Sequence, residues 1–366
     1  MRVLMTADAV GGIWNYSLTL ARAMANCGVS YTLAVMGPPP SDAQLAEAAA
    51  IPSLEVQHRA FRLEWMEEPW GDVDAAGDWL LELDREYRPD LVHLNGYSHA
   101  ALHFGAPKIV VAHSCVCSWW RAVHGEPAPG RWDEYRRRVS AGLKASDLVA
   151  APSATMIRDL ECEYGAFPDT GPGTAVIPNA AELPEGIDGD RRFRIIFAAA
   201  RFDDESKNLA LLQKAARRVP WPVFVAGGGP ACSGVHMTGR LPHRAVLDRM
   251  ARAEIFCHPA LYEPFGLAPL EAALSGCALA LSDIPSLREV WGDAALFFNP
   301  QDAVAAGDVL NRLISDGELR RGMAEAAQRR ATLFTPRLQS EGYARAYDSV
   351  RTFSGRETAL SVAWRT

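Results

Sequence analysis

The 366-residue chain lacks the signatures of several protein classes. It has no excess of basic charge, since 37 Lys and Arg stand against 44 Asp and Glu, for a net charge of −7. Without a strongly basic field a protein has few cations to displace the counterions of a nucleic acid, so we expect no nucleic-acid partner. No run of about eighteen apolar residues occurs, and the N-terminus has no long apolar segment. We therefore expect a cytoplasmic protein and leave open a peripheral contact with the inner face of a membrane.

The sequence also lacks a metal-binding pattern. Its seven cysteines are scattered, and the only close pair, Cys115 and Cys117, lacks the C-x-x-C spacing of a zinc site. The strings Asp72-Val73-Asp74 and Asp188-Gly189-Asp190 contain paired carboxylates, but no predicted strand comes directly before either. We interpret both strings as surface segments, and we expect free thiols, no metal and no cofactor.

The dinucleotide fingerprint G-x-G-x-x-G is missing too. Glycine loops open the first predicted helix, at Gly11-Gly12, and follow a predicted strand, at Gly227–Gly229. The strand Tyr31–Met36 ends without the acidic residue that holds a ribose in nicotinamide enzymes, so a dehydrogenase is disfavoured. Each loop is either a plain tight turn or a set of backbone N–H groups facing an anion.

What the sequence does contain is the composition of a globular protein, with 49% apolar and 22% charged residues. The length favours two domains. Short apolar runs alternate with helical periodicity, which predicts an α/β fold of parallel sheets covered by helices on both faces. The polar segment Asn179–Asp190 separates the halves, and 1–182 and 191–336 are the predicted domains. The expected strands are Val3–Thr6, Tyr31–Met36, Leu91–Leu94, Lys108–Ala112, Leu148–Ala151, Ala175–Ile177, Arg194–Ala200, Val223–Ala226, Ile255–His258, Cys277–Leu281 and Ala295–Phe298.

The most informative segment is EPFGLAPLE, residues 263–271. Glu263 precedes a Gly-containing loop, and Glu271 falls in the first turn of a predicted apolar helix. Each carboxylate either complements the helix dipole or accepts hydrogen bonds from sugar hydroxyls at the edge of a sheet. Arg201 and Lys207 follow another predicted strand, where an Arg and a Lys can neutralise a diphosphate without a metal.

Three further features of the N-terminal half each have more than one interpretation. His113 ends a predicted strand, as either a structural hydrogen-bonding residue or a ligand contact. The segments Phe61–Trp79 and Trp119–Trp132 are rich in aromatic residues, which either line an acceptor groove, face a membrane or pack in the core. A basic cluster, with either a lipid-facing or a solvated role, consists of Arg136, Arg137, Arg138 and Lys144.

At these residues the sequence resembles a family 4 glycosyltransferase, a retaining enzyme of the GT-B fold. The E-x7-E pattern is met by Glu263 and Glu271, and Val176–Ala181 (VIPNAA) is similar to the family's VIPNG linker, with Ala180 where glycine is usual. Both cations of the family's G-R…K-G element are present, but Ala200 and Asn208 replace its glycines. The resemblance implies two Rossmann-like domains facing each other across a cleft. It also implies a C-terminal helix, 337–353, that returns to the first domain, followed by a tail, 354–366.

The resemblance further implies a role for each site residue. Arg201 and Lys207 would bind the donor diphosphate, while Glu263 and His113 would contact the transferred sugar. Glu271 would hold the ribose. The remaining donor-binding residues implied are Gly11, Gly12, Gly239, Arg240, Leu241, Phe265, Gly266 and Leu267.

The function implied is metal-independent transfer of a hexose, with retention, from a UDP- or GDP-linked sugar to a hydroxyl acceptor. The product would be a glycan such as a polysaccharide, a glycolipid or a small glycoside. Two alternatives stay open: a nucleotide-sugar-binding protein without catalysis, and an isomerase or hydrolase that acts on a nucleotide sugar. A GT-A transferase is disfavoured, because it would need a D-x-D string at the end of a strand. The acceptor, the nucleotide, the sugar and the oligomeric state are not readable from the sequence.

Overall fold

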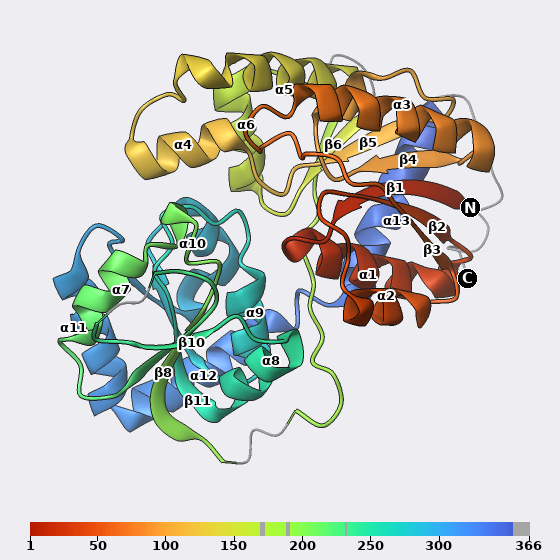
Figure 1. The fold of residues 1–366 in the computed structure, drawn as a ribbon. Coiled ribbons are helices and arrows are strands. Elements are labelled where there is room, and N and C mark those ends of the chain that lie inside the picture. Colours follow the sequence, from red (N-terminus) through yellow and green to blue (C-terminus); the bar gives the residue numbers. More distant parts are fainter. Residues whose placement is uncertain (169–172, 188–190, 231–232, 354–366) are drawn as a thin grey trace. The chain divides into compact units, whose positions relative to one another are not determined.

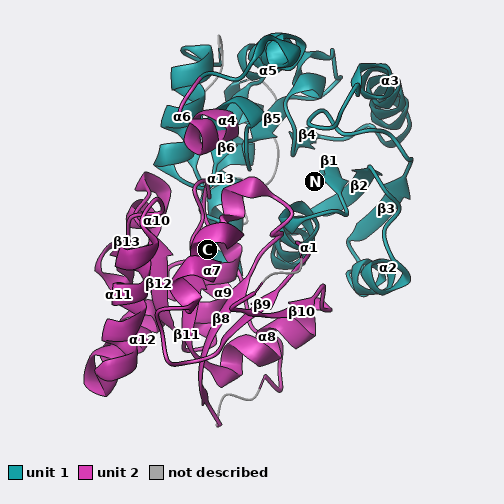
Figure 2. Ribbon diagram, turned by 60° about the vertical axis from the view of Figure 1, so that its left-hand side comes forward, with its two compact units in different colours: residues 1–118, 127–179, 336–366 teal, residues 119–126, 180–335 magenta. Residues whose placement is uncertain are grey.

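The structure is a computed structural model, described for residues 1–168, 173–187, 191–230 and 233–353. Within these residues the chain forms two compact units (Figure 2). Unit 1 contains 1–118, 127–179 and the C-terminal segment from 336, and unit 2 contains 119–126 and 180–335. The expected tail, 354–366, and the string Asp188-Gly189-Asp190 lie outside the described residues.

Unit 1 is built on a parallel sheet of seven strands within the described residues, in the order β3-β2-β1-β4-β5-β6-β7 (Figure 1). All six strands expected in this half are present, and the edge strand β3 was not expected. Their bounds are β1 (Arg2–Asp8), β2 (Ser30–Met36), β3 (Leu54–His58), β4 (Leu91–Leu94), β5 (Lys108–Val111), β6 (Leu148–Ala151) and β7 (Gly173–Val176).

Both faces of this sheet are buried. Along β1, Val3 and Met5 point into a core that contains Trp14 of α1, while Leu4 points into a second core with Trp79 of α3. This alternation is the period-two geometry of a strand with helices on both sides. The helices of unit 1 are α1 (Gly12–Met24), α2 (Asp42–Ala49), α3 (Trp70–Tyr87), α5 (Asp133–Ala145), α6 (Ala154–Tyr164) and α13 (Pro336–Phe353). Helix α4 (Val116–His124) has most of its residues in unit 2.

Helix α13 closes the first of these cores. Its residues Tyr343, Tyr347 and Val350 are at most 1% exposed and pack with α1. Unit 1 is therefore built from both ends of the chain, and Figure 1 shows the blue C-terminal helix alongside the red N-terminal elements.

Unit 2 repeats the architecture with six parallel strands among the residues described, in the order β10-β9-β8-β11-β12-β13. The five expected strands are present, and β10 is additional. Their bounds are β8 (Phe193–Ala199), β9 (Val223–Ala226), β10 (His236–Gly239), β11 (Ala253–His258), β12 (Ala278–Ser282) and β13 (Leu296–Phe298).

Alternation along β8 also divides the core of unit 2. Phe197 packs with α9 and α10 on one face, and Ile196 packs with α7 and α11 on the other. The helices are α7 (Leu209–Ala216), α8 (His243–Arg252), α9 (Leu267–Leu274), α10 (Pro285–Trp291), α11 (Ala303–Ser315) and α12 (Gly317–Ala331). The predicted α/β fold of two parallel sheets is confirmed.

The strand orders identify where each sheet can bind a ligand. In unit 1 the order reverses between β1 and β4, and in unit 2 it reverses between β8 and β11. Loops that leave the carboxyl ends of two such strands diverge to opposite faces and leave a crevice between them. The site residues are therefore expected in the loops after β1, β4, β8 and β11.

Candidate active site

In unit 2, the loops after β8 and β11 bring three polar side chains together. Lys207 lies on a short 3₁₀ turn after β8, and its Nζ is 3.1 Å from Oε2 of Glu263. His258, the last residue of β11, places Nε2 3.1 Å from the same oxygen. All three side chains are less than 20% exposed. A carboxylate, an ammonium group and an imidazole therefore form one compact cluster at the switch point.

The charge of Glu263 is fixed by these neighbours. Burial by itself raises the pKa of the carboxyl group, but the charge of Lys207 and a hydrogen bond from His258 hold it well below the usual range. Because an ionised carboxylate only accepts hydrogen bonds, His258 donates through Nε2–H. The backbone of Glu263 is fixed as well, since its carbonyl accepts a 2.5 Å hydrogen bond from Ser286 Oγ.

Helix α9 starts beside this cluster. Its N-cap is Gly266, with φ of 93°, and a Cβ there would lie 3.1 Å from the ring of Pro269. Only glycine adopts this left-handed turn without strain, and the turn leaves the first amides of α9, from Leu267 onward, at the site. The preceding residue, Phe265, packs edge-on against Phe334 in the core, so it can meet a ligand only through its backbone.

Glu271 lies on the same helix. The sequence placed it in the first turn, but α9 begins at Leu267, so Glu271 is in the second turn. Its side chain is 14% exposed, and Oε1 is 2.8 Å from Nε2 of His243, the first residue of α8. Sequence reasoning missed His243 because its partner is 28 residues away.

The two predicted arginines have looser surroundings. Arg201 is 52% exposed and lies 3.7 Å from Asp204, which also accepts hydrogen bonds from the amide of Ser206 and from Trp119 Nε1. Arg240 is 80% exposed and lies 3.4 Å from Asp203. Arg201 therefore shares the loop of Lys207 but is not paired with Glu263. Both guanidinium groups are exposed enough to change partners when an anion arrives.

The glycine loop after β9 has a packing explanation. A Cβ on Gly227 would lie 1.8 Å from the carbonyl oxygen of Ala200, and one on Gly229 would lie 3.1 Å from Phe202. The amide of Gly227 donates a 2.9 Å hydrogen bond to the carbonyl of Gly239, the last residue of β10. These glycines are needed so that three strand ends can approach closely.

The other glycine pair has no such packing constraint. Gly11 is the N-cap of α1, in an extended conformation with φ of −144°, and no atom lies within 4 Å of the position of a Cβ. No side chain caps this helix, and Gly12 is its first residue. Open space in front of uncapped helical N–H groups is what an anion site requires.

His113 lies in unit 1, two residues after β5. Its Nε2 is 2.8 Å from Oδ1 of Asn95, which follows β4, and its ring packs edge-on against Tyr16 of α1 with centroids 4.4 Å apart. Burial lowers the pKa of His113 to about 3, so the imidazole is neutral at physiological pH. Sequence reasoning found His113 but missed Asn95.

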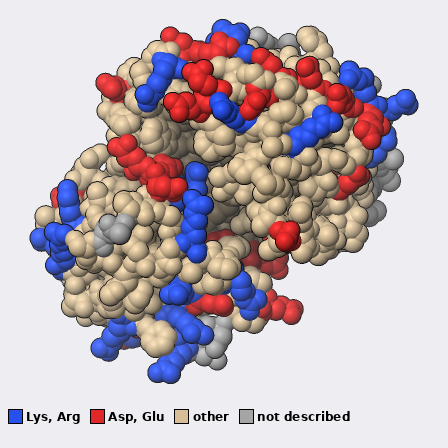
Figure 3. Space-filling view, in the orientation of Figure 1, with Lys and Arg blue, Asp and Glu red and all other residues tan. Residues whose placement is uncertain are grey.

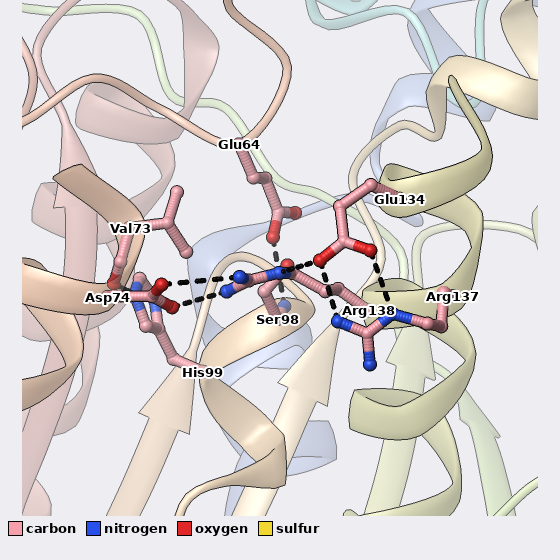
Figure 4. Close-up of polar contacts among 8 residues, drawn as sticks. All are labelled: Glu64, Val73, Asp74, Ser98, His99, Glu134, Arg137 and Arg138. Carbon is pink, nitrogen blue, oxygen red and sulfur yellow. Dashed lines mark hydrogen bonds and ion pairs between the residues drawn. The ribbon is translucent and has the colours of Figure 1, made fainter. Parts of the chain in front are cut away.

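The string Asp72-Val73-Asp74 and the basic cluster are joined by the ion pair of Asp74 with Arg138. Figure 4 shows Arg138 between Asp74 of α3 and Glu134 of α5, with Arg137 on the other side of Glu134. Arg136 pairs with Asp133. Each of these arginines thus has an acidic partner, and the interpretation as a solvated helix face explains the cluster without a lipid. Over the face seen in Figure 3, basic and acidic side chains occur together and neither sign dominates.

Among the residues that the structure describes, no cluster of three or more His, Cys, Asp and Glu side chains is arranged to hold a metal ion. No described helix combines the length and apolar character needed to cross a membrane.

Two family models together match most of the chain. Residues 10–183 match "Glycosyltransferase Family 4", and residues 184–330 match "Glycosyl transferases group 1". The chain belongs to the family 4 glycosyltransferases. The resemblance seen in the sequence is therefore confirmed, and the protein is a glycosyltransferase.

Curated relatives are distant. A glycogen synthase of Mycobacterium tuberculosis is 26% identical over 281 residues, 69% of this chain and 66% of the relative. A phosphatidyl-myo-inositol mannosyltransferase of Mycolicibacterium smegmatis is 25% identical over 47% of this chain and 52% of its own length. The matches thus span about one half to two thirds of these relatives.

Solved structures share the fold. Sucrose-phosphate synthase from Thermosynechococcus elongatus superposes with a TM-score of 0.74 at 18% identity, covering 97% of this chain and all of that one. Anabaena HepE, solved in complex with UDP-glucose, gives a TM-score of 0.73 at 16% identity over 95% of this chain and all of its own. The fold of this glycosyltransferase is that of the GT-B class.

Proposed function

We propose that this glycosyltransferase moves a hexose from a UDP- or GDP-linked sugar to a hydroxyl acceptor, with retention of anomeric configuration and without a metal ion. The observation that carries the proposal is the cluster of Lys207, Glu263 and His258 at the switch point of unit 2. It places a fixed cation and a fixed carboxylate beside the N-terminus of α9, where a nucleoside diphosphate can be bound.

Lys207 is equipped to stabilise the leaving group. An ammonium group has three N–H donors, and Nζ approaches Glu263 Oε2 at 3.1 Å and the carbonyl of Tyr262 at 3.4 Å. One donor is left for a diphosphate oxygen. When the bond from the anomeric carbon to the diphosphate breaks, the negative charge that develops meets Lys207, Arg201 and the amides of Gly266 and Leu267. One such preorganised donor lowers a barrier by about 3–4 kcal/mol.

Glu263 is better suited to hold a sugar than to attack one. Its Oε2 already accepts hydrogen bonds from Lys207 and His258, and its low pKa marks a weak nucleophile. Its Oε1 has no hydrogen-bond partner in the described residues and can accept one from a sugar hydroxyl. We therefore favour attack by the acceptor oxygen on the face that the diphosphate leaves, with the acceptor proton passing to a phosphate oxygen. Detection of a glycosyl-enzyme adduct by intact mass would overturn this choice.

The remaining roles follow the same chemistry. Glu271 would hold the ribose hydroxyls, with His243 sharing its carboxylate. Gly11 and Gly12 would face the diphosphate through backbone N–H groups, and the segment Gly239–Leu241 would border the base. His113 would contact the transferred sugar.

The first experiment is calorimetric titration of the protein with UDP, GDP and ADP, with and without EDTA. Micromolar binding of one nucleotide, unchanged by EDTA and lost in Glu271→Ala, supports the donor site. Binding that EDTA abolishes, or no binding at all, would refute the proposed roles. Glu318→Ala serves as a control, since the Glu318 side chain is 88% exposed and its carboxylate pairs with the neighbouring Arg321 on α12.

A second experiment separates transfer from the alternatives. The nucleoside diphosphate that binds is then supplied as two donors, one carrying glucose and one carrying mannose. The first acceptors tested are glucans and inositol phospholipids, because the relatives include a glycogen synthase and a phosphatidyl-myo-inositol mannosyltransferase. Donor consumption that needs an acceptor, with an α-linked product by NMR, supports a retaining transferase. Equal consumption without an acceptor would favour a hydrolase or isomerase, and binding without any turnover would favour a protein that has lost catalysis.

A further inference from the structure

A chain of hydrogen-bonded polar groups, half-buried or buried, starts at His113. Asn95 is the first link: Oδ1 is 2.8 Å from His113 Nε2, Nδ2 is 2.7 Å from the carbonyl oxygen of Thr6, and the amide nitrogen is 2.9 Å from Thr6 Oγ1. Thr6 belongs to β1 and Asn95 follows β4, so the amide side chain sits at the switch point of unit 1.

The contact with Thr6 fixes which way the amide faces. A backbone carbonyl only accepts hydrogen bonds, so the atom of Asn95 that faces it must be the NH₂ group. Oδ1 therefore faces His113, and it can only accept. It follows that His113 carries its proton on Nε2, and that Nδ1 of the neutral ring is an unprotonated acceptor.

A second histidine contacts Asn95. His93, which is fully buried, places Nε2 3.2 Å from Asn95 Oδ1 and 3.2 Å from the hydroxyl of Tyr16, and it places Nδ1 2.7 Å from the hydroxyl of Tyr347. Both tyrosine hydroxyls can donate or accept, so His93 can satisfy its ring nitrogens in either tautomer. The Nε2–H form of His113 follows from the orientation of Asn95 and does not depend on the tautomer of His93.

We propose that Asn95 is a positioning residue that holds His113 in its Nε2–H tautomer, so that Nδ1 is available to accept a hydrogen bond from a hydroxyl group of the transferred sugar. The inference rests on the proposed function for the sugar contact, whereas the tautomer is a property of the free protein. A histidine without this constraint could expose either a donor or an acceptor. With it, the site discriminates against a sugar that lacks the hydroxyl.

The tautomer is measured by NMR on ligand-free protein labelled with ¹⁵N-histidine, with the signals assigned by His113→Ala and His93→Gln. In the unmodified protein we expect His113 to be the Nε2–H form. Asn95→Leu removes the acceptor and should convert His113 to a mixture of tautomers. Tyr347→Phe is the matched control, because it removes a partner of His93 and leaves Asn95 in place. An unchanged His113 tautomer in Asn95→Leu would overturn the proposal.

Loss of folding in Asn95→Leu would not leave the question open, because Asn95→Asp tests it differently. Aspartate keeps an acceptor beside His113 Nε2, so the tautomer should persist, and its negative charge should raise the pKa of His113. Among the described residues, the titratable side chains that contact the His113 ring or Asn95 are Tyr16, which packs against the ring, and His93, which shares Asn95 Oδ1. Burial raises the pKa of Tyr16 and lowers the pKa of His93 to about 3, so both side chains are uncharged near neutral pH. A His113 whose pKa does not rise in Asn95→Asp, or whose tautomer changes, would refute the contact.

Enzyme kinetics test whether the contact between Asn95 and His113 contributes to sugar transfer. Asn95→Leu should lower kcat/KM for the sugar donor by up to about 100-fold, the scale of a misplaced catalytic contact. In a His113→Ala background the same substitution should have little further effect, because the group it positions is gone. Independent, additive losses would contradict a positioning role. If no donor reacts but His113 still has the Nε2–H tautomer, the proposed function is refuted and the positioning of His113 by Asn95 still holds.

Discussion

At the scale of single residues, the cluster around Glu263 makes the stability of unit 2 depend on one buried charge pair. Lys207→Met removes the cation and leaves the carboxylate buried without its main partner. We expect a loss of about 3–5 kcal/mol in the free energy of unfolding, as for other buried pairs that lose one member. Urea denaturation measures it. The double variant Lys207→Met/Glu263→Gln should recover most of the loss, and a double variant as unstable as the single one would contradict the explanation.

The same carboxylate gives a pH dependence of definite sign. The pKa of Glu263 in the folded protein lies below its ordinary value of 4.5, so the unfolded chain takes up the proton first as pH falls. Its stabilising contribution is complete above about pH 4.5 and is lost as pH falls toward the folded pKa. Glu263→Gln should therefore flatten the decline in unfolding free energy below about pH 4.5. An equally steep decline in the variant would show that other carboxylates account for it.

At the scale of elements, the N-cap glycines of α1 and α9 can be compared by the same substitution. Gly266→Ala at α9 puts a Cβ 3.1 Å from Pro269 at a φ of 93°, and we expect it to cost about 1–3 kcal/mol of stability. Gly11→Ala at α1 meets open space at an extended φ and should change stability by less than about 0.5 kcal/mol. Thermal unfolding compares them. If Gly11→Ala nevertheless weakens nucleotide binding, the proposed diphosphate contact gains support, whereas unchanged binding would contradict it.

Helix α13 is a part of unit 1 that comes late in the chain. Ending the protein after Thr335 would uncover Trp14 and Tyr31 and remove Tyr343, Tyr347 and Val350 from their core. Burying one such side chain contributes about 1.5–3 kcal/mol, so the truncated chain should lack a folded unit 1. Near-UV circular dichroism and limited proteolysis test this. A truncated protein with native spectra and an intact N-terminal half would show that α13 is dispensable.

Much of both sheets could be predicted, because their central strands are short apolar runs buried on both faces. The strand β3 could not: Leu54–His58 alternates polar residues at a sheet edge, and none of its side chains is fully buried. Glu263, Lys207 and His113 could be found from motifs. Their partners could not, since His258 and Asn95 are single residues at strand ends. What marks them is a distance to a residue on another strand or loop, and a sequence alone does not give that distance.

At the scale of the whole molecule, ligand binding should protect the two units unequally. A nucleotide at 100 times its Kd stabilises the folded state by about 2.7 kcal/mol. If unit 2 holds the nucleotide, hydrogen exchange should slow most in the loops after β8 and β11 and in the first turn of α9. Helix α5 of unit 1 is the internal reference. Protection that is greatest in α5 would argue that the nucleotide binds elsewhere.

The return of the chain into unit 1 also bears on synthesis at the ribosome. Many multidomain proteins complete their N-terminal domain first. Here the residues of unit 1 up to 179 wait for a helix that is translated only after all of 180–335 has emerged. At about 5–20 residues per second this interval is on the order of ten seconds. During that time the surface that will receive Tyr343 and Tyr347 is uncovered, and unit 2 can be the first part of the molecule to mature.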